Sequence, residues 1–176
     1  GVIRPTVECI GELTQNRHVG ILATSGTIKS ESYLLEIEKL FPDVTVTGEA
    51  CPMWVPLVEN NEYDSEGANY FVQKHIRQLL AKDPDIDTLI LGCTHYPLLI
   101  EKIRQFTPSH IRIVPQGEYV AQSLQNYFRR HPEMDNRCTK EGTCRFLTTE
   151  SETKFEESAS IFLQQEDIHV ERIILE

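Results

Sequence analysis

The chain has 176 residues, of which 40% are apolar and 25% charged. That length and composition are typical of one globular domain or slightly more, and they argue against a disordered chain. Lysine and arginine number 17 against 27 aspartates and glutamates, so the formal net charge is −10. We expect no nucleic-acid partner and no membrane contact, because nucleic acids and anionic membranes are bound through basic patches and no apolar run approaches the roughly 20 residues of a membrane span.

Short apolar runs alternate with amphipathic stretches along the chain, which predicts strands that alternate with helices. In chain order we expect a strand over 19–24, a helix over 29–40, a strand over 44–47, a helix over 65–82, a strand over 88–92, a helix over 97–106, a strand over 111–114, a helix over 117–130, a strand over 145–148, a helix over 151–164 and a strand over 170–175. The polar, aperiodic segment 131–142 contains a proline and a glycine, and it predicts an exposed excursion.

This order of elements predicts an α/β fold with a mainly parallel sheet flanked by helices. We expect one nearly complete lobe over 1–115, followed over 116–176 by a C-terminal segment that belongs to a second, truncated lobe. The chain has no initiator methionine, so we expect it to be a piece of a longer protein. Its five cysteines, an odd number without a common zinc-site spacing, are typical of free thiols in a reducing cytosol, and we therefore expect a cytoplasmic protein.

The strongest candidate for chemistry is the run Leu-Ile-Leu-Gly-Cys-Thr-His-Tyr-Pro at 89–97. A buried strand ends there and a helix begins at Pro97, so Cys93 and His95 are expected at the carboxyl edge of the sheet, where ligands of open α/β proteins bind. The helix N-terminus offers free N–H groups and a positive partial charge, which hold a carboxylate and lower the pKa of a thiol toward neutrality. Such a thiol can take or give a proton, with the imidazole assisting. Two alternatives stay open: a cysteine that is only a small buried apolar residue, and a zinc site, which would lack a companion pair of ligands.

Two further segments carry candidate binding groups. The strand-end loop Ala-Thr-Ser-Gly-Thr at 23–27 is typical of an anion cradle, although Thr27 could instead be the N-cap of the next helix. The segment 50–59 ends in Glu59, which could orient a histidine or simply lie in solvent at a helix end. Cys51 has apolar neighbours and is predicted to be structural.

These segments occur in the order and approximate spacing of bacterial glutamate racemase, which the chain resembles over essentially its whole length. The resemblance rests on 1–5, 23–27, 50–52, 55–59, 91–99, 146–149, Phe155 and 170–171. Its most specific part is Gly-Cys-Thr-His-Tyr-Pro, because the broader aspartate/glutamate racemase superfamily shares Gly-Cys-Thr but usually not His-Tyr-Pro.

The resemblance implies an isomerase that interconverts L- and D-glutamate without a cofactor or metal and supplies D-glutamate for peptidoglycan, and so for cell-wall biogenesis and cell shape. One cysteine removes the α-proton from one face and a second reprotonates the other face. By this resemblance Cys93 is the catalytic cysteine of the second half, His95 assists proton transfer, and Glu59 supports the histidine. The positions implied to contact substrate are Thr24, Thr27, Thr94 and His95.

The chain also departs from the family. The first-half motifs, Asp-Ser, Tyr-Gly and a first catalytic cysteine in an Asn-Thr context, have no match, and Cys9 lies in a helix-like context that does not fit that role. We therefore expect the C-terminal two-thirds of the enzyme, with half an active site and no activity alone. The partners implied are glutamate, the missing N-terminal part of the same chain and, as an open alternative, a second copy in a homodimer. A second departure is Pro115-Gln116-Gly117, where the family is expected to have smaller residues before the glycine.

Three other functions remain as alternatives. An aspartate or other amino-acid racemase of the same superfamily is disfavoured by Tyr96-Pro97. A non-catalytic ligand-binding lobe is disfavoured by the joint presence of Cys93 and His95. A cysteine hydrolase would need an oxyanion hole beside a nucleophile–histidine pair.

Overall fold

The computed structural model describes residues 1–175, and the chain divides into two compact units, Gly1–Arg130 and His131–Glu176. No helix within these described residues is long and apolar enough to cross a membrane.

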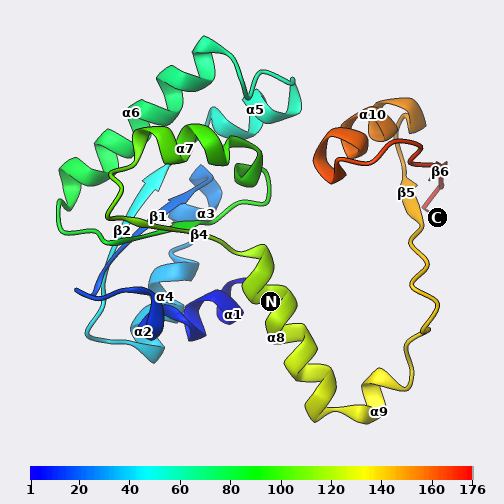
Figure 1. Cartoon of the computed structure of the whole chain (residues 1–176), viewed down its shortest axis with the longest axis horizontal. Helices are drawn as coiled ribbons and strands as arrows, with labels where there is room; N and C mark the ends of the chain where they lie inside the picture. The colour runs from blue at the N-terminus through cyan, green and yellow to red at the C-terminus, as the bar shows by residue number, and fades with distance from the viewer. Residues whose placement is uncertain (176) are drawn as a thin grey trace. The chain divides into compact units, whose positions relative to one another are not determined.

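The first unit is built on a four-stranded sheet in which all neighbouring strands are parallel (Figure 1). Its strands, in the spatial order β2-β1-β3-β4, are β2 (Thr45–Ala50), β1 (His18–Ala23), β3 (Thr88–Leu91) and β4 (Arg112–Pro115). All of β3 and all but the first residue of β1 are buried, as their apolar sequences require of central strands covered on both faces. The predicted α/β fold with a parallel sheet is confirmed.

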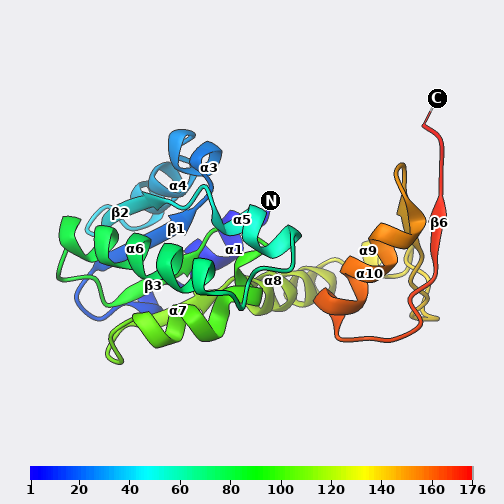
Figure 2. The ribbon, with the colours of Figure 1, turned by 90° about the horizontal axis from the view of Figure 1, so that it is seen from above.

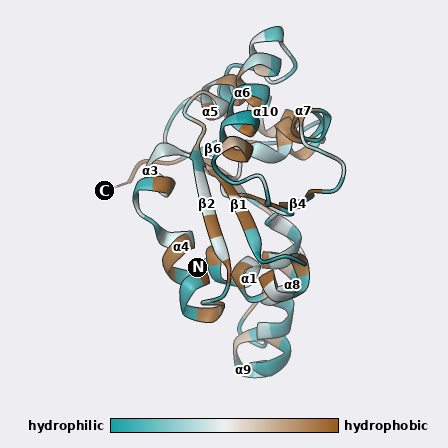
Figure 3. Cartoon of the chain, turned by 90° about the vertical axis from the view of Figure 1, so that its left-hand side faces the viewer, coloured by the Kyte–Doolittle hydropathy of each residue, from teal (hydrophilic) through white to brown (hydrophobic). Residues whose placement is uncertain are grey.

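Helices cover both faces of this sheet. One apolar cluster lies under α5 (Trp54–Glu59), α6 (Glu66–Lys82), the 3₁₀ turn η1 (Tyr96–Leu99) and α7 (Ile100–Phe106). The other lies under α1 (Ile3–Glu8), α2 (Ile10–Leu13), α3 (Ser25–Lys29), α4 (Ser32–Leu40) and the start of α8 (Gly117–Arg130). In Figure 2, α6 and α7 lie in front of the strands. Figure 3 shows the apolar residues of β1 in brown.

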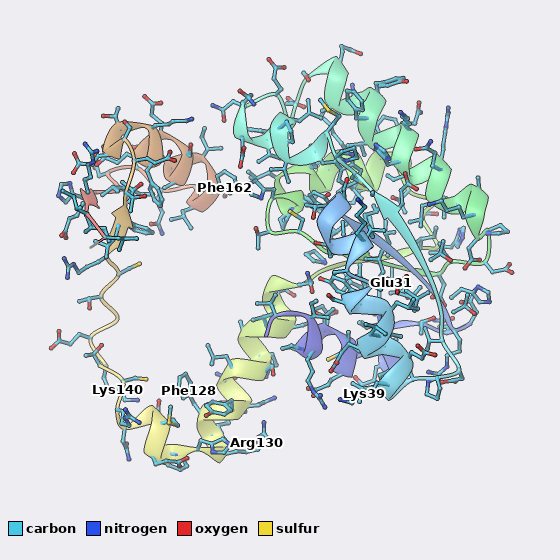
Figure 4. All side chains as sticks on the ribbon, turned by 180° about the vertical axis from the view of Figure 1, so that it is seen from behind. Glu31, Lys39, Phe128, Arg130, Lys140 and Phe162 are labelled. Carbon is cyan, nitrogen blue, oxygen red and sulfur yellow. The ribbon has the colours of Figure 1, made fainter. Side chains whose placement is uncertain are left out.

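Each predicted strand and helix has a counterpart in the structure, but several bounds differ and three helices, α1, α2 and α5, were not predicted. The strand predicted over 44–47 extends to Ala50, and the strand predicted over 170–175 ends at Arg172. The helix predicted over 29–40 begins at Ser32 as α4, because Glu31 (labelled in Figure 4) takes a left-handed conformation (φ 53°) between it and α3, which ends at Lys29. The helix predicted from 97 begins as the 3₁₀ turn η1. The excursion predicted over 131–142 contains one short helix, α9 (Pro132–Asp135).

The second unit has little core of its own. Its two short strands, β5 (Phe146–Thr148) and β6 (Val170–Arg172), pair in parallel beside α10 (Glu152–Leu163). Among its described apolar side chains only Ala159 and Val170 are buried. Its large exposed apolar side chains are Leu147, Phe155, Phe162 (labelled in Figure 4), Leu163, Ile174 and Leu175. The predicted lobe boundary at 115 concerns which lobe of a complete enzyme each segment joins, and it stays a prediction.

The amino end of β1 carries an ion pair that makes stability depend on pH. His18 Nδ1 lies 3.0 and 3.1 Å from the two carboxylate oxygens of Asp83, and this hydrogen bond raises the pKa of His18. Burial acts to raise the pKa of Asp83, but hydrogen bonds from His18 and from the N–H of Asp85 outweigh it, and the pKa is lowered. The pair therefore stabilises the fold between about pH 4 and pH 6.5, and its contribution is lost as pH rises through the raised pKa of His18 or falls through the lowered pKa of Asp83.

Replacing His18 with glutamine is expected to lower the free energy of unfolding by about 1 kcal/mol or less at pH ~5.5, and by clearly less at pH ~8.5, because the His18 side chain is 30% exposed and the pair is screened. Urea unfolding at the two pH values measures this. His110→Gln, at an exposed histidine, is the matched control. An equal loss at both pH values would show that the charge on His18 contributes nothing.

Candidate functional site

Loops from different strands meet at the carboxyl edge of the sheet. Leu22 of β1 pairs in register with Leu91 of β3, so Thr24 and Cys93, each two residues further on, leave adjacent strands at the same level. The N–H of Gly92 donates to the carbonyl of Leu22 at 2.8 Å and ties the two strand ends together. The topology therefore brings the predicted hydroxyl loop and the predicted cysteine to one edge.

Cys93, His95 and Glu59 form a row at this edge. Cys93 Sγ lies 3.7 Å from His95 Nδ1, and the other ring nitrogen, Nε2, lies 3.3 Å from Glu59 Oε1. The imidazole is 27% exposed and the Glu59 carboxylate 60%, so the row runs from a half-buried thiol outward to solvent. A base bonded to a thiol and oriented by a carboxylate is an arrangement able to move a proton to and from sulfur.

The electrostatics of Cys93 differ from the prediction. Burial raises the pKa of this thiol, the backbone N–H groups of His95, Thr94 and Tyr96 lower it, and the negative charge of Glu59 raises it again; the net direction is upward. The expectation that its surroundings lower the pKa toward neutrality is therefore wrong for this structure. The reason is that the thiol is half-buried beside a carboxylate, while the helix in front of it begins as a single 3₁₀ turn.

The hydroxyl loop after β1 is organised by Thr24. The N–H of Thr27 donates to Thr24 Oγ1 at 3.3 Å, and the two hydroxyl oxygens lie 3.0 Å apart. Thr24, and not Thr27, is the N-cap of α3. Thr94 is exposed directly beside Cys93 in the sequence. The substrate-contacting roles predicted for these three threonines stay predictions.

The apolar cluster against which Cys93 packs contains two buried aromatic side chains, here called the aromatic floor. Tyr96 and Trp54 are fully buried with ring centroids 4.7 Å apart, and the Tyr96 hydroxyl donates to the carbonyl of Cys51 at 3.4 Å. Cys51 is 1% exposed, and burial raises the pKa of its thiol. Its predicted structural role is consistent with this burial.

Two residues near the site were not identified from the sequence as site residues. The hydroxyl of Tyr33 donates to Gln116 Oε1 at 2.8 Å, and Gln116 Nε2 donates to the carbonyl of Leu91 at 3.0 Å. Tyr33 lies within the helix predicted over 29–40 and was given no separate role, and Gln116 was noted only as a departure from the family. The one sequence signal for Gln116 is its position directly after a strand of the same sheet, and Tyr33, inside α4, has no such signal.

One group of described side chains could together reach a metal ion, and it lies elsewhere. His18, Asp83 and Asp85, toward the amino end of β1, place their ligand atoms within 4.8 Å of one another. The oxygens of Asp83 already accept hydrogen bonds from His18, Thr47 and the N–H of Asp85, so the cluster is held together without an ion.

Comparison with known proteins decides the family. The model of the Asp/Glu/hydantoin racemase family matches residues 1–124, most of this chain. The chain belongs to the Asp/Glu/hydantoin racemase family. Within that racemase family, a curated relative is the glutamate racemase of Streptococcus agalactiae serotype III, which is 38% identical over an alignment that covers 99% of this chain and 65% of the relative.

Solved structures agree with this assignment to the Asp/Glu/hydantoin racemases. Glutamate racemase RacE1 from Bacillus anthracis superposes with a TM-score of 0.87 at 30% identity, over 99% of this chain and 64% of that one. The Francisella tularensis enzyme, solved in complex with D-glutamate, gives a TM-score of 0.83 at 27% identity, over 98% and 62%. The chain thus spans just under two thirds of the length of these relatives. The predicted resemblance to glutamate racemase is confirmed.

Proposed function

We propose that this chain supplies one half of a glutamate racemase site, with Cys93 as the acid/base group on one face of the substrate α-carbon. The observation that carries the proposal is the row of Cys93, His95 and Glu59 at the carboxyl edge of the sheet, beside the Thr24 loop. The names of the relatives support glutamate as substrate, and the Francisella tularensis relative was solved with D-glutamate.

The chemistry follows from the row. His95 takes the proton of Cys93, and Glu59 stabilises the resulting imidazolium, which leaves a thiolate at the sheet edge. The thiolate removes the α-proton of glutamate, the C–H electron pair delocalises into the substrate carboxylate, and nearby N–H and hydroxyl donors stabilise that charge. A proton delivered to the opposite face completes the inversion, so no redox step and no cofactor are required.

The second proton donor is proposed to come from a part of the enzyme outside this chain. Cys51 is buried, and the thiol of Cys9 donates to the carbonyl of Pro5 at 3.5 Å between α1 and α2. Cys138 and Cys144 are exposed in the second unit.

We propose that the same missing part covers the exposed apolar side chains of the second unit, since such side chains otherwise face water. A second copy of the chain is the alternative cover.

The setting of the enzyme is part of the proposal. Proton transfer through Cys93 requires a free thiol, and all five cysteines are free in the structure. A reducing cytoplasm keeps thiols in that form. The D-glutamate formed there would supply peptidoglycan synthesis.

The test measures racemisation of L-glutamate, and the loss of optical activity of the solution is the readout. The chain alone is expected to show no turnover, and the chain joined to the remaining part of its parent protein is expected to racemise glutamate. Aspartate offered to the joined protein distinguishes the alternative substrate. Turnover by the chain alone at the rate of the joined protein would contradict the half-site, and racemisation of aspartate but not glutamate would contradict the substrate.

A further inference from the structure

The end of β3, immediately before Cys93, is held by two side chains from distant parts of the first unit. Leu91 is the last residue of this strand, and its carbonyl accepts a hydrogen bond from Gln116 Nε2 at 3.0 Å. Gln116 Oε1 accepts the hydroxyl proton of Tyr33 at 2.8 Å. Both ends of the Gln116 amide are therefore engaged, and a chain of two hydrogen bonds runs from α4 through Gln116 to the end of β3, two residues before Cys93.

Gln116 is placed to reach this carbonyl by the pairing of the two strands. Leu91 pairs in register with Pro115, the last residue of β4, and Gln116 follows directly. The side-chain amide of Gln116 therefore bonds the end of β3 from the side of β4. On the other side of β3 the N–H of Gly92 donates to the carbonyl of Leu22, so the strand end is fixed from both neighbouring strands.

Tyr33 also fixes Gly92 by contact. Its side chain is 5% exposed, and a Cβ added to Gly92 would lie 3.2 Å from Tyr33 Cε2 and 3.0 Å from the Cβ of Ala23. The ring therefore lies directly against the backbone at Gly92. Burial raises the pKa of Tyr33 to about 12, so its hydroxyl keeps its proton and remains a donor to Gln116 at neutral pH.

We propose that Gln116 and Tyr33 are positioning residues that hold the Gly92–Cys93 backbone, and through it the Cys93 thiol, in place for proton transfer. The inference rests on the proposed function for its purpose. Its geometry is independent of the substrate, because both side chains act through the carbonyl of Leu91 and the backbone of Gly92. It concerns two side chains to which the sequence gives no role in the reaction.

The experiment measures the pH dependence of Cys93 alkylation by iodoacetamide in this chain, without glutamate, resolved by mass spectrometry of the Cys93 peptide. In Gln116→Ala the strand end is released and water reaches the Cys93 thiol, which favours the thiolate. The midpoint of the alkylation profile is therefore expected to fall by about half a pH unit or more, which is about a threefold increase in thiolate fraction. Tyr33→Phe keeps the ring against Gly92 and removes only the hydroxyl. Its midpoint is expected to move in the same direction by less.

Matched controls separate local release from general loosening. Gln122→Ala, an exposed glutamine of α8, and Tyr70→Phe, an exposed tyrosine of α6, are expected to leave the profile unchanged. Cys51, 1% exposed in the same unit, reports global opening in every sample. If Gln116→Ala does not fold, Tyr33→Phe decides alone.

The proposal is overturned if the folded variants keep the wild-type Cys93 profile, or if Cys51 becomes reactive together with Cys93. Because glutamate is absent, the result does not depend on the racemase proposal. A shifted Cys93 profile in a protein that never racemises glutamate would support the positioning role of Gln116 and Tyr33 and contradict only the proposed reaction.

Discussion

Replacing Cys93 with alanine is expected to lower the rate of glutamate racemisation by about 10²–10⁴-fold or more in the complete protein that contains this chain, the range that a positioned acid/base group contributes. The thiol is the group that His95 contacts at 3.7 Å, and alanine offers no proton there. Polarimetry of L-glutamate solutions gives the rate. Cys144→Ala, at an exposed cysteine of the second unit, is the matched control and is expected to retain full activity. Comparable rates for Cys93→Ala and the unaltered protein would remove Cys93 from the mechanism.

Trp54→Ala is expected to lower the free energy of unfolding by about 3–5 kcal/mol, the usual cost of truncating a buried aromatic side chain. Trp54 is fully buried, and its ring centroid lies 4.7 Å from that of Tyr96 and 6.4 Å from that of His75. Alanine at this position therefore leaves a cavity beneath the Cys93 row. Denaturant unfolding measures the loss. Trp54→Phe is expected to cost less, because Trp54 Nε1 has no hydrogen-bond partner among the described residues and phenylalanine keeps an aromatic ring.

Tyr70→Ala serves as the surface control for that measurement. Tyr70 is 62% exposed, and its truncation is expected to change the free energy of unfolding by about 0.5 kcal/mol or less. A loss for Trp54→Ala as small as that for Tyr70→Ala would mean that the aromatic floor does not support the fold.

Local patterns predicted much of the first unit. Helix α8 spans Gly117–Arg130, the predicted 117–130, because its amphipathic period is unbroken and Gly117 follows a strand. The buried strand before Cys93 was also predicted, since a short, nearly continuous apolar run is typical of a strand covered on both faces of a parallel sheet. The break at Glu31 was not, because a left-handed residue in the middle of an apolar helical pattern leaves no local signal.

The site was predictable in its residues and not in its electrostatics. The Gly-Cys-Thr-His run placed Cys93 and His95 together because they are two residues apart on one loop. The direction of the Cys93 pKa depends on burial of the thiol and on the charge of Glu59, and the residues around Cys93 in the sequence report neither effect. The bond between Tyr33 and Gln116 joins residues 83 positions apart, and no pattern within either segment reports it.

The central claim, that Cys93 faces the α-carbon of bound glutamate, is tested most directly by substrate protection of that thiol. Cys93 alkylation by iodoacetamide is followed at neutral pH in the complete protein with and without saturating glutamate, and exposed Cys138 serves as the internal reference. We predict that glutamate slows alkylation of Cys93 severalfold and leaves Cys138 unchanged. Equal rates at Cys93 with and without glutamate, in a sample that racemises it, would contradict the account.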